Sequence, residues 1–391
     1  MSKIDDLIEK LCPDGVEYKS LKSLAKIQTG KLNANAMVEN GKYPFFTCNE
    51  KPYRIDTYAF EAEAILISGN GSKVGHVNYY KGKFNAYQRT YVLTQFSNDI
   101  QVTFLLHYLR GFIRDYIFSC AKKGSVPYIT LPMLENFCLP VPPLEIQEEI
   151  VCVLDSFAEL ETELETELER RKAQYVYYRD QLLDFKNENV LAKSFCSNRP
   201  KYRQLKDIAS YVKSKIDVES LPASSYVGVE DLKQNFQGRT ACNIERHHSC
   251  SATEYIPGDI LLGNIRPYLK KMWLSDSYGG ASGDVLVIRP NDQKEIMSKF
   301  LWYCLTTDDF VSFIVRHSRG GKMPRGDKKM IMNYFVPVPP LEVQQRIVDI
   351  LDKFDALVND ISQGLPAEIE ARRKQYEYYR DKLLTFKEKV N

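Results

Sequence analysis

One long stretch of this sequence occurs twice. Residues 140–185 read PVPPLEIQEEIVCVLDSFAELETELETELERRKAQYVYYRDQLLDF, and residues 337–386 read PVPPLEVQQRIVDILDKFDALVNDISQGLPAEIEARRKQYEYYRDKLLTF. The copies are 197 residues apart up to Phe157/Phe354 and 201 residues apart from Gln174/Gln375 onward, so the second copy is four residues longer. A repeat of this length predicts a chain built from two copies of one unit.

The repeated stretch has the pattern of a long helix. Its Pro-Pro pair stops the preceding structure and suits the first turn of a helix. Apolar residues then recur at alternating spacings of four and three, which is typical of a coiled-coil seam. A helix from Leu144 to Phe185 would be roughly 63 Å long. In the first copy the stripe consists of Ile146, Ile150, Val153, Phe157, Leu160 and Leu164, continued by Leu168, Tyr175, Tyr178 and Leu182.

The second copy contains a break. Gly364-Leu365-Pro366 interrupts its stripe beside the four extra residues. Because proline removes a helical hydrogen bond, we expect the second helix to kink or restart there.

A short internal repeat, ELE-TELE-TELE, occupies residues 159–169 of the first copy. Adding or removing one four-residue unit would change the helix length by about 6 Å and nearly preserve its apolar face. The segment is therefore a candidate molecular ruler, that is, a spacer whose length carries information. The alternative is an acidic, slippage-prone helix whose length has no role.

The segments between the long stretches also repeat, but more loosely. Strands are expected at Glu63–Ser68 and Arg89–Thr94, and a helix over Thr103–Phe118. The matching pairs are YKSLKSLA (18–25) with YRQLKDIA (202–209), FEAEAILISGNGS (60–72) with YIPGDILLGNIRP (255–267), and FLLHYL (104–109) with FLWYCL (300–305). The resulting division is a globular domain at 1–140, a helix at 141–186, a linker at 187–200, a globular domain at 201–337 and a helix at 338–391.

Charge is divided between these parts. Residues 1–140 hold 17 basic and 13 acidic side chains, and residues 187–340 hold 22 and 16. Residues 141–186 hold 5 basic and 12 acidic side chains, and residues 341–391 hold 9 and 10. Basic globular parts beside acidic helices suggest an anionic partner for the globular parts alone. If only one globular part had such an excess of basic side chains, an ordinary solvated surface would be enough to explain it.

Three features favour a cytoplasmic protein without a membrane partner. No apolar run approaches the roughly 20 residues that span a bilayer, and the charged start MSKIDDLIEK lacks the apolar core of a signal peptide. The nine cysteines are odd in number and form no CxxC pair, as expected for buried thiols in a reducing compartment.

Catalytic motifs do not emerge from the sequence. Gly69-Asn70-Gly71 follows a strand pattern but lacks the GxGxxG spacing. No Asn-Pro-Pro-aromatic or Asp-Pro-Pro-aromatic tetrapeptide of an amino methyltransferase occurs. Cys242, His247, His248 and Cys250 could bind zinc, but they lack paired-ligand spacing, and a polar loop is the favoured interpretation. We therefore predict a non-enzymatic chain that binds no metal or cofactor itself.

Basic and polar loops are the positive signal. Arginine suits guanine, asparagine and glutamine suit adenine, and lysine mainly neutralises phosphates. The candidate DNA-binding residues of the first domain are Asn70, Lys73, Gln88, Arg89, Lys122, Lys123, Ser125 and Tyr128. Those of the second domain are Asn264, Arg266, Tyr268, Lys270, Lys271, Arg316, Arg319, Lys322, Arg325 and Lys328. For any one of them, solvated surface is the competing interpretation.

Taken together, these features resemble the specificity subunit of type I restriction–modification systems. The resemblance rests on the twin PVPPLExQ…RRKxQYxYYRDxLL stretches, the opening LCPDGVEY (11–18) and the run GNIRPYL (263–269). It implies an α+β protein in which two mixed α/β target-recognition domains are separated by two long antiparallel helices that form a coiled coil with pseudo-twofold symmetry. Each domain would read one half of a split, asymmetric site on double-stranded DNA.

The resemblance also implies partners. Two modification subunits would methylate adenine with S-adenosylmethionine, and restriction subunits would add ATP- and Mg²⁺-dependent cleavage. The modification subunits would dock on the helices, for which the recurring motif supplies candidate contacts. These are Tyr175, Tyr178 and Arg179 in the first copy and Tyr376, Tyr379 and Arg380 in the second. A coiled-coil adaptor whose basic lobes hold an acidic protein is the alternative.

Overall fold

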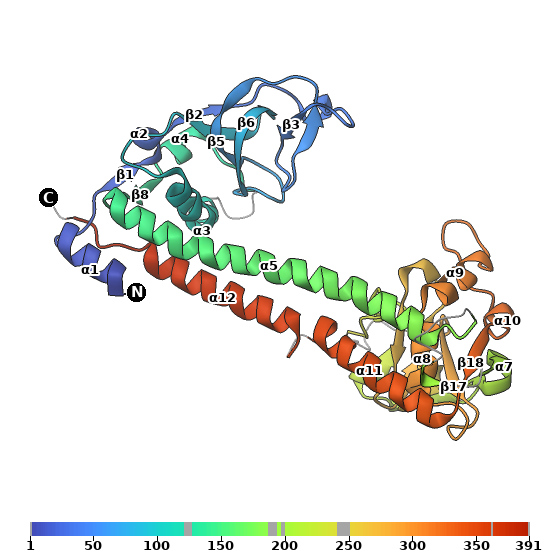
Figure 1. Ribbon diagram of the computed structural model, residues 1–391. Coiled ribbons are helices and arrows are strands. Elements are labelled where there is room, and N and C mark those ends of the chain that lie inside the picture. The colour runs from blue at the N-terminus through green and yellow to red at the C-terminus, as the bar shows by residue number, and fades with distance from the viewer. Residues whose placement is uncertain are drawn as a thin grey trace. The chain divides into compact units, whose positions relative to one another are not determined.

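The computed structural model describes residues 2–120, 127–186, 194–196, 200–240, 251–360 and 363–389. The chain divides into two compact units (Figure 1). Unit 1 comprises residues 1–164 and 369–391, and unit 2 comprises residues 165–368. Both long helical stretches are therefore shared between units, whereas the sequence pattern had suggested segments separate from the globular domains.

Unit 1 is built on one six-stranded sheet. Alternate residues of its central strand face opposite sides. Ile65 and Ile67 pack with the helix α3 (Val102–Cys120), while Ala64 and Leu66 pack with Phe84 in a second cluster. The sheet order is β2 (Lys26–Thr29), β7 (Thr90–Thr94), β5 (Phe60–Ser68), β6 (Val77–Ala86), β3 (Tyr43–Phe46) and β4 (Tyr53–Ile55). The expected strands and helix of this domain are confirmed.

Shorter elements complete unit 1. The strands β1 (Tyr18–Ser20) and β8 (Cys138–Pro140) pair antiparallel directly before the first long helix. The remaining helical elements are α1 (Ser2–Leu11), α2 (Leu21–Leu24), η1 (Ala34–Ala36) and α4 (Leu131–Glu135).

Unit 2 divides the corresponding strands between two four-stranded sheets. Ile260 and Leu262 face a core with the helix α8 (Ser298–Leu305), and Leu261 faces a second cluster. The first sheet has the order β10 (Ala209–Tyr211), β17 (Val285–Pro290), β14 (Ile260–Gly263) and β15 (Met272–Leu274). The second has the order β11 (Lys215–Asp217), β13 (Ser251–Tyr255), β16 (Gly279–Ala281) and β12 (Tyr226–Val227).

The other elements of unit 2 surround these sheets. The strands β9 (Lys201–Gln204) and β18 (Phe335–Val338) repeat the antiparallel pairing of β1 with β8. The remaining helical elements are α7 (Leu205–Ile208), η2 (Val218–Ser220), η3 (Ala223–Ser225), η5 (Pro267–Leu269), α9 (Asp308–Arg316) and α10 (Lys328–Ile331).

The two copies of the long stretch have different helical forms. The first copy is one helix, α5 (Leu144–Leu183), of 40 residues. The second is two helices, α11 (Leu341–Asn359) and α12 (Leu365–Leu383), so the predicted restart is confirmed. Gly364 occupies the restart, where an added Cβ would lie 2.5 Å from the carbonyl oxygen of Ala356.

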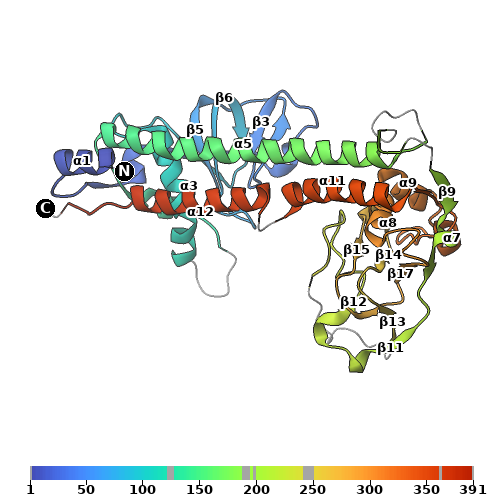
Figure 2. The ribbon, with the colours of Figure 1, turned by 60° about the horizontal axis from the view of Figure 1, so that its bottom comes forward.

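Within each unit, α5 runs antiparallel to a helix of the second copy (Figure 2). In unit 1, Phe157 stacks on Tyr379 with ring centroids 5.3 Å apart, and Glu161 pairs with Arg373 at 2.8 Å. In unit 2, Tyr178 stacks on Phe354 at 5.7 Å, which is the same pair of repeat positions with the partners exchanged.

The ends of the long helices belong to the domain cores. Ile146, Ile150 and Leu154 are fully buried in the core of unit 1. Leu182 and Ile347 are buried in the core of unit 2. The middle of the stripe, from Leu160 to Leu168, is only half-buried. The apolar stripe is therefore fully buried in the domain cores at its ends and only partly shielded from solvent in its middle.

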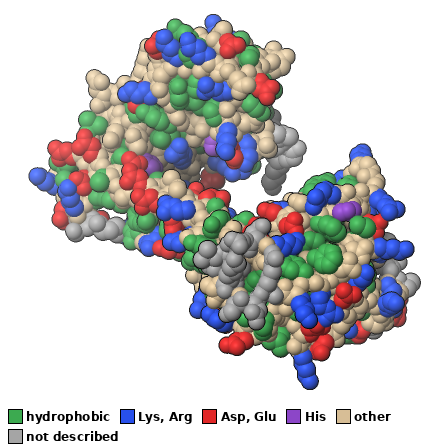
Figure 3. Space-filling model, turned by 45° about the vertical axis from the view of Figure 1, so that its right-hand side comes forward, with side chains coloured by type: hydrophobic (Ala, Val, Ile, Leu, Met, Phe, Trp, Pro, Cys, Tyr) green, Lys and Arg blue, Asp and Glu red, His purple; other side chains and the backbone are tan. Residues whose placement is uncertain are grey.

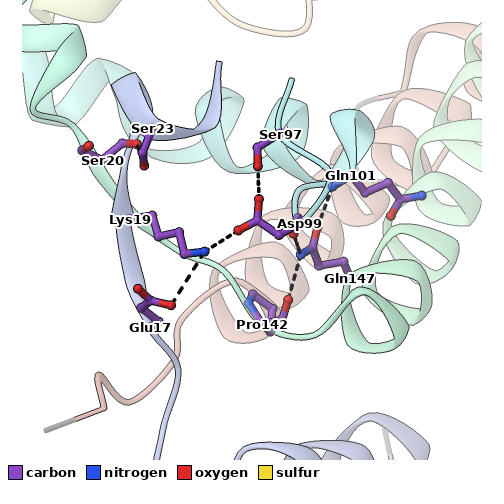
Figure 4. A network of polar contacts seen from close by, with 9 residues as sticks. All are labelled: Glu17, Lys19, Ser20, Ser23, Ser97, Asp99, Gln101, Pro142 and Gln147. Carbon is purple, nitrogen blue, oxygen red and sulfur yellow. Dashed lines mark hydrogen bonds and ion pairs between the residues drawn. The ribbon is translucent and has the colours of Figure 1, made fainter. Parts of the chain in front are cut away.

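A buried glutamine attaches each long helix to its globular domain. In unit 1, the Gln147 side chain accepts from the Gln101 backbone N–H at 2.8 Å (Figure 4). It also donates to the carbonyls of Asp99 (2.8 Å) and Pro142 (2.7 Å). Asp99 in turn pairs with Lys19 of β1. One network thus ties β1, the turn before α3 and the first turn of α5.

Candidate nucleic-acid interface

Three loops meet at one place in unit 1. The backbone N–H of Gly69, after β5, donates to the carbonyl of Arg89, before β7, at 2.8 Å. The N–H of Ile129, on the segment after α3, donates to the carbonyl of Gly69 at 2.9 Å. These bonds bring together three loops that are far apart in the sequence and that carry the predicted residues Asn70, Arg89 and Tyr128.

The same three loops meet in unit 2. The N–H of Asn264 donates to the carbonyl of Asp284 at 2.9 Å, and the N–H of Gly326 donates to the carbonyl of Asn264 at 3.3 Å. The offsets, 195 and 197 residues, are those of the repeat. Arg89 and Asp284 therefore occupy equivalent positions in the two units. Tyr128 and Arg325 form a second equivalent pair.

Four of the predicted residues of unit 1 lie around this junction. Gln88, Arg89 and Tyr128 are exposed, and Asn70 is half-buried. A cavity of about 220 Å³ is lined by Gly69, Gln88, Arg89, Tyr91 and Ile129. Lys122, Lys123 and Ser125 lie outside the described residues.

Two predicted residues of unit 1 have polar partners that the sequence did not reveal. Gln88 donates to the side chain of Asn33 at 2.9 Å. Lys73 pairs with Glu50, and this hydrogen bond lowers the pKa of the Glu50 carboxyl. No local pattern marked Asn33 or Glu50, because tertiary pairing alone places them beside the junction.

In unit 2, the run GNIRPYL forms a strained turn. Arg266 and Lys270, on either side of η5, both have left-handed backbones, with φ of 50° and 54°. Such angles are uncommon outside glycine and are often found at functional sites. Asn264 is buried, Arg266 is half-buried and Tyr268 is half-exposed.

The two lysines of this turn are engaged within the protein. The Lys270 ammonium pairs with Asp308 at 2.6 Å and holds the pKa of that carboxyl below its usual range. The Lys271 ammonium donates to the carbonyl of Val229 at 2.7 Å. A contact of either lysine with DNA would have to compete with these bonds, and the roles predicted for them remain predictions.

A short hairpin carries most of the remaining basic residues. The backbones of Arg319 and Arg325 exchange two hydrogen bonds of 2.8 Å, and Gly320 turns between them with φ of 99°. The Arg319 side chain pairs with Asp327 at 2.9 Å. The five predicted DNA-binding residues of this region, all of them exposed, are Arg316, Arg319, Lys322, Arg325 and Lys328.

The candidate partner contacts on the helices are mostly inward-facing. Tyr175 and Arg179 are buried, and Tyr178 and Tyr379 stack in the seams described above. The Tyr376 hydroxyl lies 3.1 Å from His107 Nδ1. Arg380 is 18% exposed in its side chain and pairs with Asp381. Tyr175 and Arg179 are buried within this chain, and the contacts predicted for them with a modification subunit stay predictions.

Two tyrosines of the motif face outward, and neither was among the predicted contacts. Tyr177 is 58% exposed and Tyr378 is 63% exposed. They occupy equivalent positions of the repeat, 201 residues apart. Each lies edge-on to its neighbour, Tyr178 or Tyr379, at 5.4 Å and 5.3 Å. The spacing of the seam gives the signal that could have found them, since both fall outside the apolar stripe.

The described ranges contain no candidate metal site and no membrane-spanning helix. No group of three or more His, Cys, Asp or Glu side chains there could hold a metal ion. Cys242, His247, His248 and Cys250 lie outside those ranges. No helix in the described part of the chain is long and apolar enough to cross a membrane. Lys and Arg side chains are spread over the surface of each globular part in the view of Figure 3.

Comparison with known proteins identifies the family. The sequence matches the model of the type I restriction modification DNA specificity domain twice, over residues 13–170 and 201–371. This chain belongs to that family. The double match also follows the internal repeat and gives no support to the adaptor interpretation.

Individual relatives agree with this assignment. The EcoDI type I specificity subunit of Escherichia coli is 28% identical over 380 residues, covering 89% of this chain and 83% of that protein. The EcoR124I/EcoR124II specificity subunit of Escherichia coli is 32% identical over 289 residues, covering 70% and 66%. The crystal structure of the S subunit from M. genitalium has a TM-score of 0.55 at 15% identity, covering 95% and 96%. The predicted α+β fold class of this chain is therefore confirmed.

Proposed function

We propose that this chain is the DNA-specificity subunit of a type I restriction–modification system and has no catalytic activity of its own. The observation that carries the proposal is the junction of three loops, built by the same backbone hydrogen bonds in both units. Arg, Asn and Gln side chains at such a junction can read base edges, and the surrounding lysines can contact phosphates.

The DNA site is proposed to be bipartite and asymmetric. Two repeated domains suit two half-sites on a duplex. The residues at the junction differ between the units, however: Arg89 and Tyr128 in one correspond to Asp284 and Arg325 in the other. Different side chains at equivalent positions favour different half-sites.

The partners are proposed to be two modification subunits and, for cleavage, restriction subunits. The modification subunits would use S-adenosylmethionine to methylate adenine, and the restriction subunits would use ATP and Mg²⁺. Exposed Tyr177 and Tyr378 are our candidates for the docking contacts, because exposed tyrosines are enriched at protein interfaces. A cytoplasmic location, where thiols stay reduced, accords with the free cysteines of the described ranges. The expectation of buried thiols is wrong for most of them, because among the described cysteines Cys304 alone is buried.

Methylome sequencing tests the function directly. A host carrying this chain together with its modification subunit should show adenine methylation at a two-part motif. The same host carrying the modification subunit alone should lack it. Absence of any bipartite motif that depends on this chain, with both proteins expressed, would exclude the proposal.

A further inference from the structure

The junction in unit 2 contains an arginine whose side chain is held by a carboxylate. Arg325 Nε lies 3.2 Å from one oxygen of Asp284, and Nη2 lies 3.4 Å from the other. Two contacts to one carboxylate fix the plane of the guanidinium group. The Nη1 edge is left to bind something else, and Arg325 is half-exposed.

The backbone of Arg325 is held as firmly as its side chain. Two hydrogen bonds join it to Arg319 across the hairpin. The adjacent Pro324 carbonyl accepts from the N–H of Arg266 at 2.8 Å. Gly326, on the other side, has no room for a side chain, because an added Cβ would lie 2.9 Å from Asn264 Oδ1.

The floor of the junction contains polar atoms that lack partners. Asn264 is 5% exposed, and its Oδ1 finds no hydrogen-bond partner among the described residues. The buried Nε of Arg266 also finds none there. Unpaired buried polar atoms are costly, and their presence beside Arg325 points to a polar ligand.

The corresponding positions of unit 1 have a different chemistry. Arg89 stands where unit 2 has Asp284, and Tyr128, 59% exposed, stands where unit 2 has Arg325. The backbone of the junction is therefore the same in both units, but it presents an oriented arginine in unit 2 and an exposed tyrosine in unit 1.

We infer that Arg325, oriented by Asp284, reads a guanine in one half-site, and that these two residues are specificity determinants of the second unit. A planar guanidinium with a free edge matches the O6 and N7 acceptors of guanine in the major groove. Lysine does not reproduce this planar pair of donors, because an ammonium group has no fixed plane. The inference rests on the proposed function and adds the base and the residues that read it.

The test compares methylomes of hosts that express the modification subunit with wild-type chain, Arg325→Lys, Asp284→Asn or Arg346→Lys. Arg325→Lys keeps the charge and removes the planar donor pair. It should make one G·C position of one half-site degenerate, by roughly ten-fold or more in preference, and leave the other half-site unchanged. Asp284→Asn should relax the same position to a smaller extent. Arg346→Lys, the same substitution on an exposed arginine of α11 outside the junction, should leave the motif unchanged.

A binding measurement covers the case in which Arg325→Lys abolishes methylation. Purified complex is titrated with duplexes that carry 7-deazaguanine, which lacks the N7 acceptor, at each guanine of the motif. One replacement should weaken wild-type binding and have little effect on Arg325→Lys. An unchanged motif in Arg325→Lys, relaxation at an A·T position, or equal sensitivity of both proteins to every replacement would overturn the inference. A wild-type chain that directs no bipartite motif would instead refute the proposed function.

Discussion

Gln147 and Gln344 make the same three hydrogen bonds in the two units. Gln344 accepts from the N–H of Met297 at 2.9 Å and donates to the carbonyls of Glu295 (2.9 Å) and Pro339 (2.8 Å). The ion pair beside Gln147, Lys19–Asp99, likewise returns as Arg203–Glu295. Both glutamines are fully buried. Each globular domain is therefore attached to its following helix by one repeated polar joint.

Replacing either glutamine by leucine should destabilise its unit strongly. Gln147→Leu leaves one backbone N–H and two carbonyls buried without partners, which we expect to cost on the order of 2–4 kcal/mol of unfolding free energy. Urea unfolding would measure the loss. Gln345→Leu is the matched control, because Gln345 is exposed and bonds only along its own helix to Asp349. If Gln344→Leu and Gln345→Leu lowered the free energy of unfolding equally, the buried glutamine would not be what attaches the domain to its helix.

Unit 1 should lose stability as the pH falls below about 6.5, in part through His107. This buried imidazole donates from Nε2 to Asp155 at 2.8 Å and accepts from Tyr376, with Arg110 and Arg380 nearby. Burial lowers the pKa of His107 below its ordinary value of 6.5, although Asp155 opposes the shift. The unfolded chain then takes up the proton first, so stability falls with pH from 6.5 toward the folded pKa.

His107→Gln keeps a donor toward Asp155 and removes the titration. Between pH 7 and 5 the variant should lose less stability than wild type, by at most about 1.4 kcal/mol per pH unit for one proton. The equivalent residue of unit 2, Tyr303, donates to Asp352 at 2.6 Å and provides the control. Tyr303→Phe should lower stability without changing the slope. Parallel pH curves for His107→Gln and wild type would disprove the role of His107.

The TELE units should determine the gap between the half-sites. Deleting Thr162–Glu165 shortens α5 by about 6 Å, roughly two base pairs of duplex. The methylated motif should keep both half-site sequences and lose base pairs only from its gap. Altered half-sites with an unaltered gap would refute the ruler and leave the segment as an acidic helix without that role.

Docking of the modification subunit should depend on the exposed tyrosines of the helices. Tyr177→Ser with Tyr378→Ser should reduce co-purification of the modification subunit, with little change in the stability of this chain. Charge reversal at Arg179 is a poor probe because that side chain is buried and its loss would disturb the core. Tyr53→Ser, on an exposed tyrosine of a strand, is the control. Co-purification at the wild-type level in the double variant would exclude these tyrosines as contacts.

The sequence alone determined the duplication, the long helices and the restart at Gly364. Each depends on local information: residue identity at a fixed offset, apolar periodicity and a proline that cannot continue a helix. It also selected Arg89, Arg325 and Asn264 as candidates, because their loops repeat between the halves.

Only the tertiary structure decided which of these groups are available and what they adjoin. The tyrosines of one motif share one helical sequence, yet Tyr175 is buried and Tyr177 exposed, because the partner helix and the globular core cover particular faces. Asp284 has no sequence signal beside Arg325, since 41 residues separate them. Their contact exists because backbone hydrogen bonds between distant loops bring the two positions together, and no local pattern encodes such bonds.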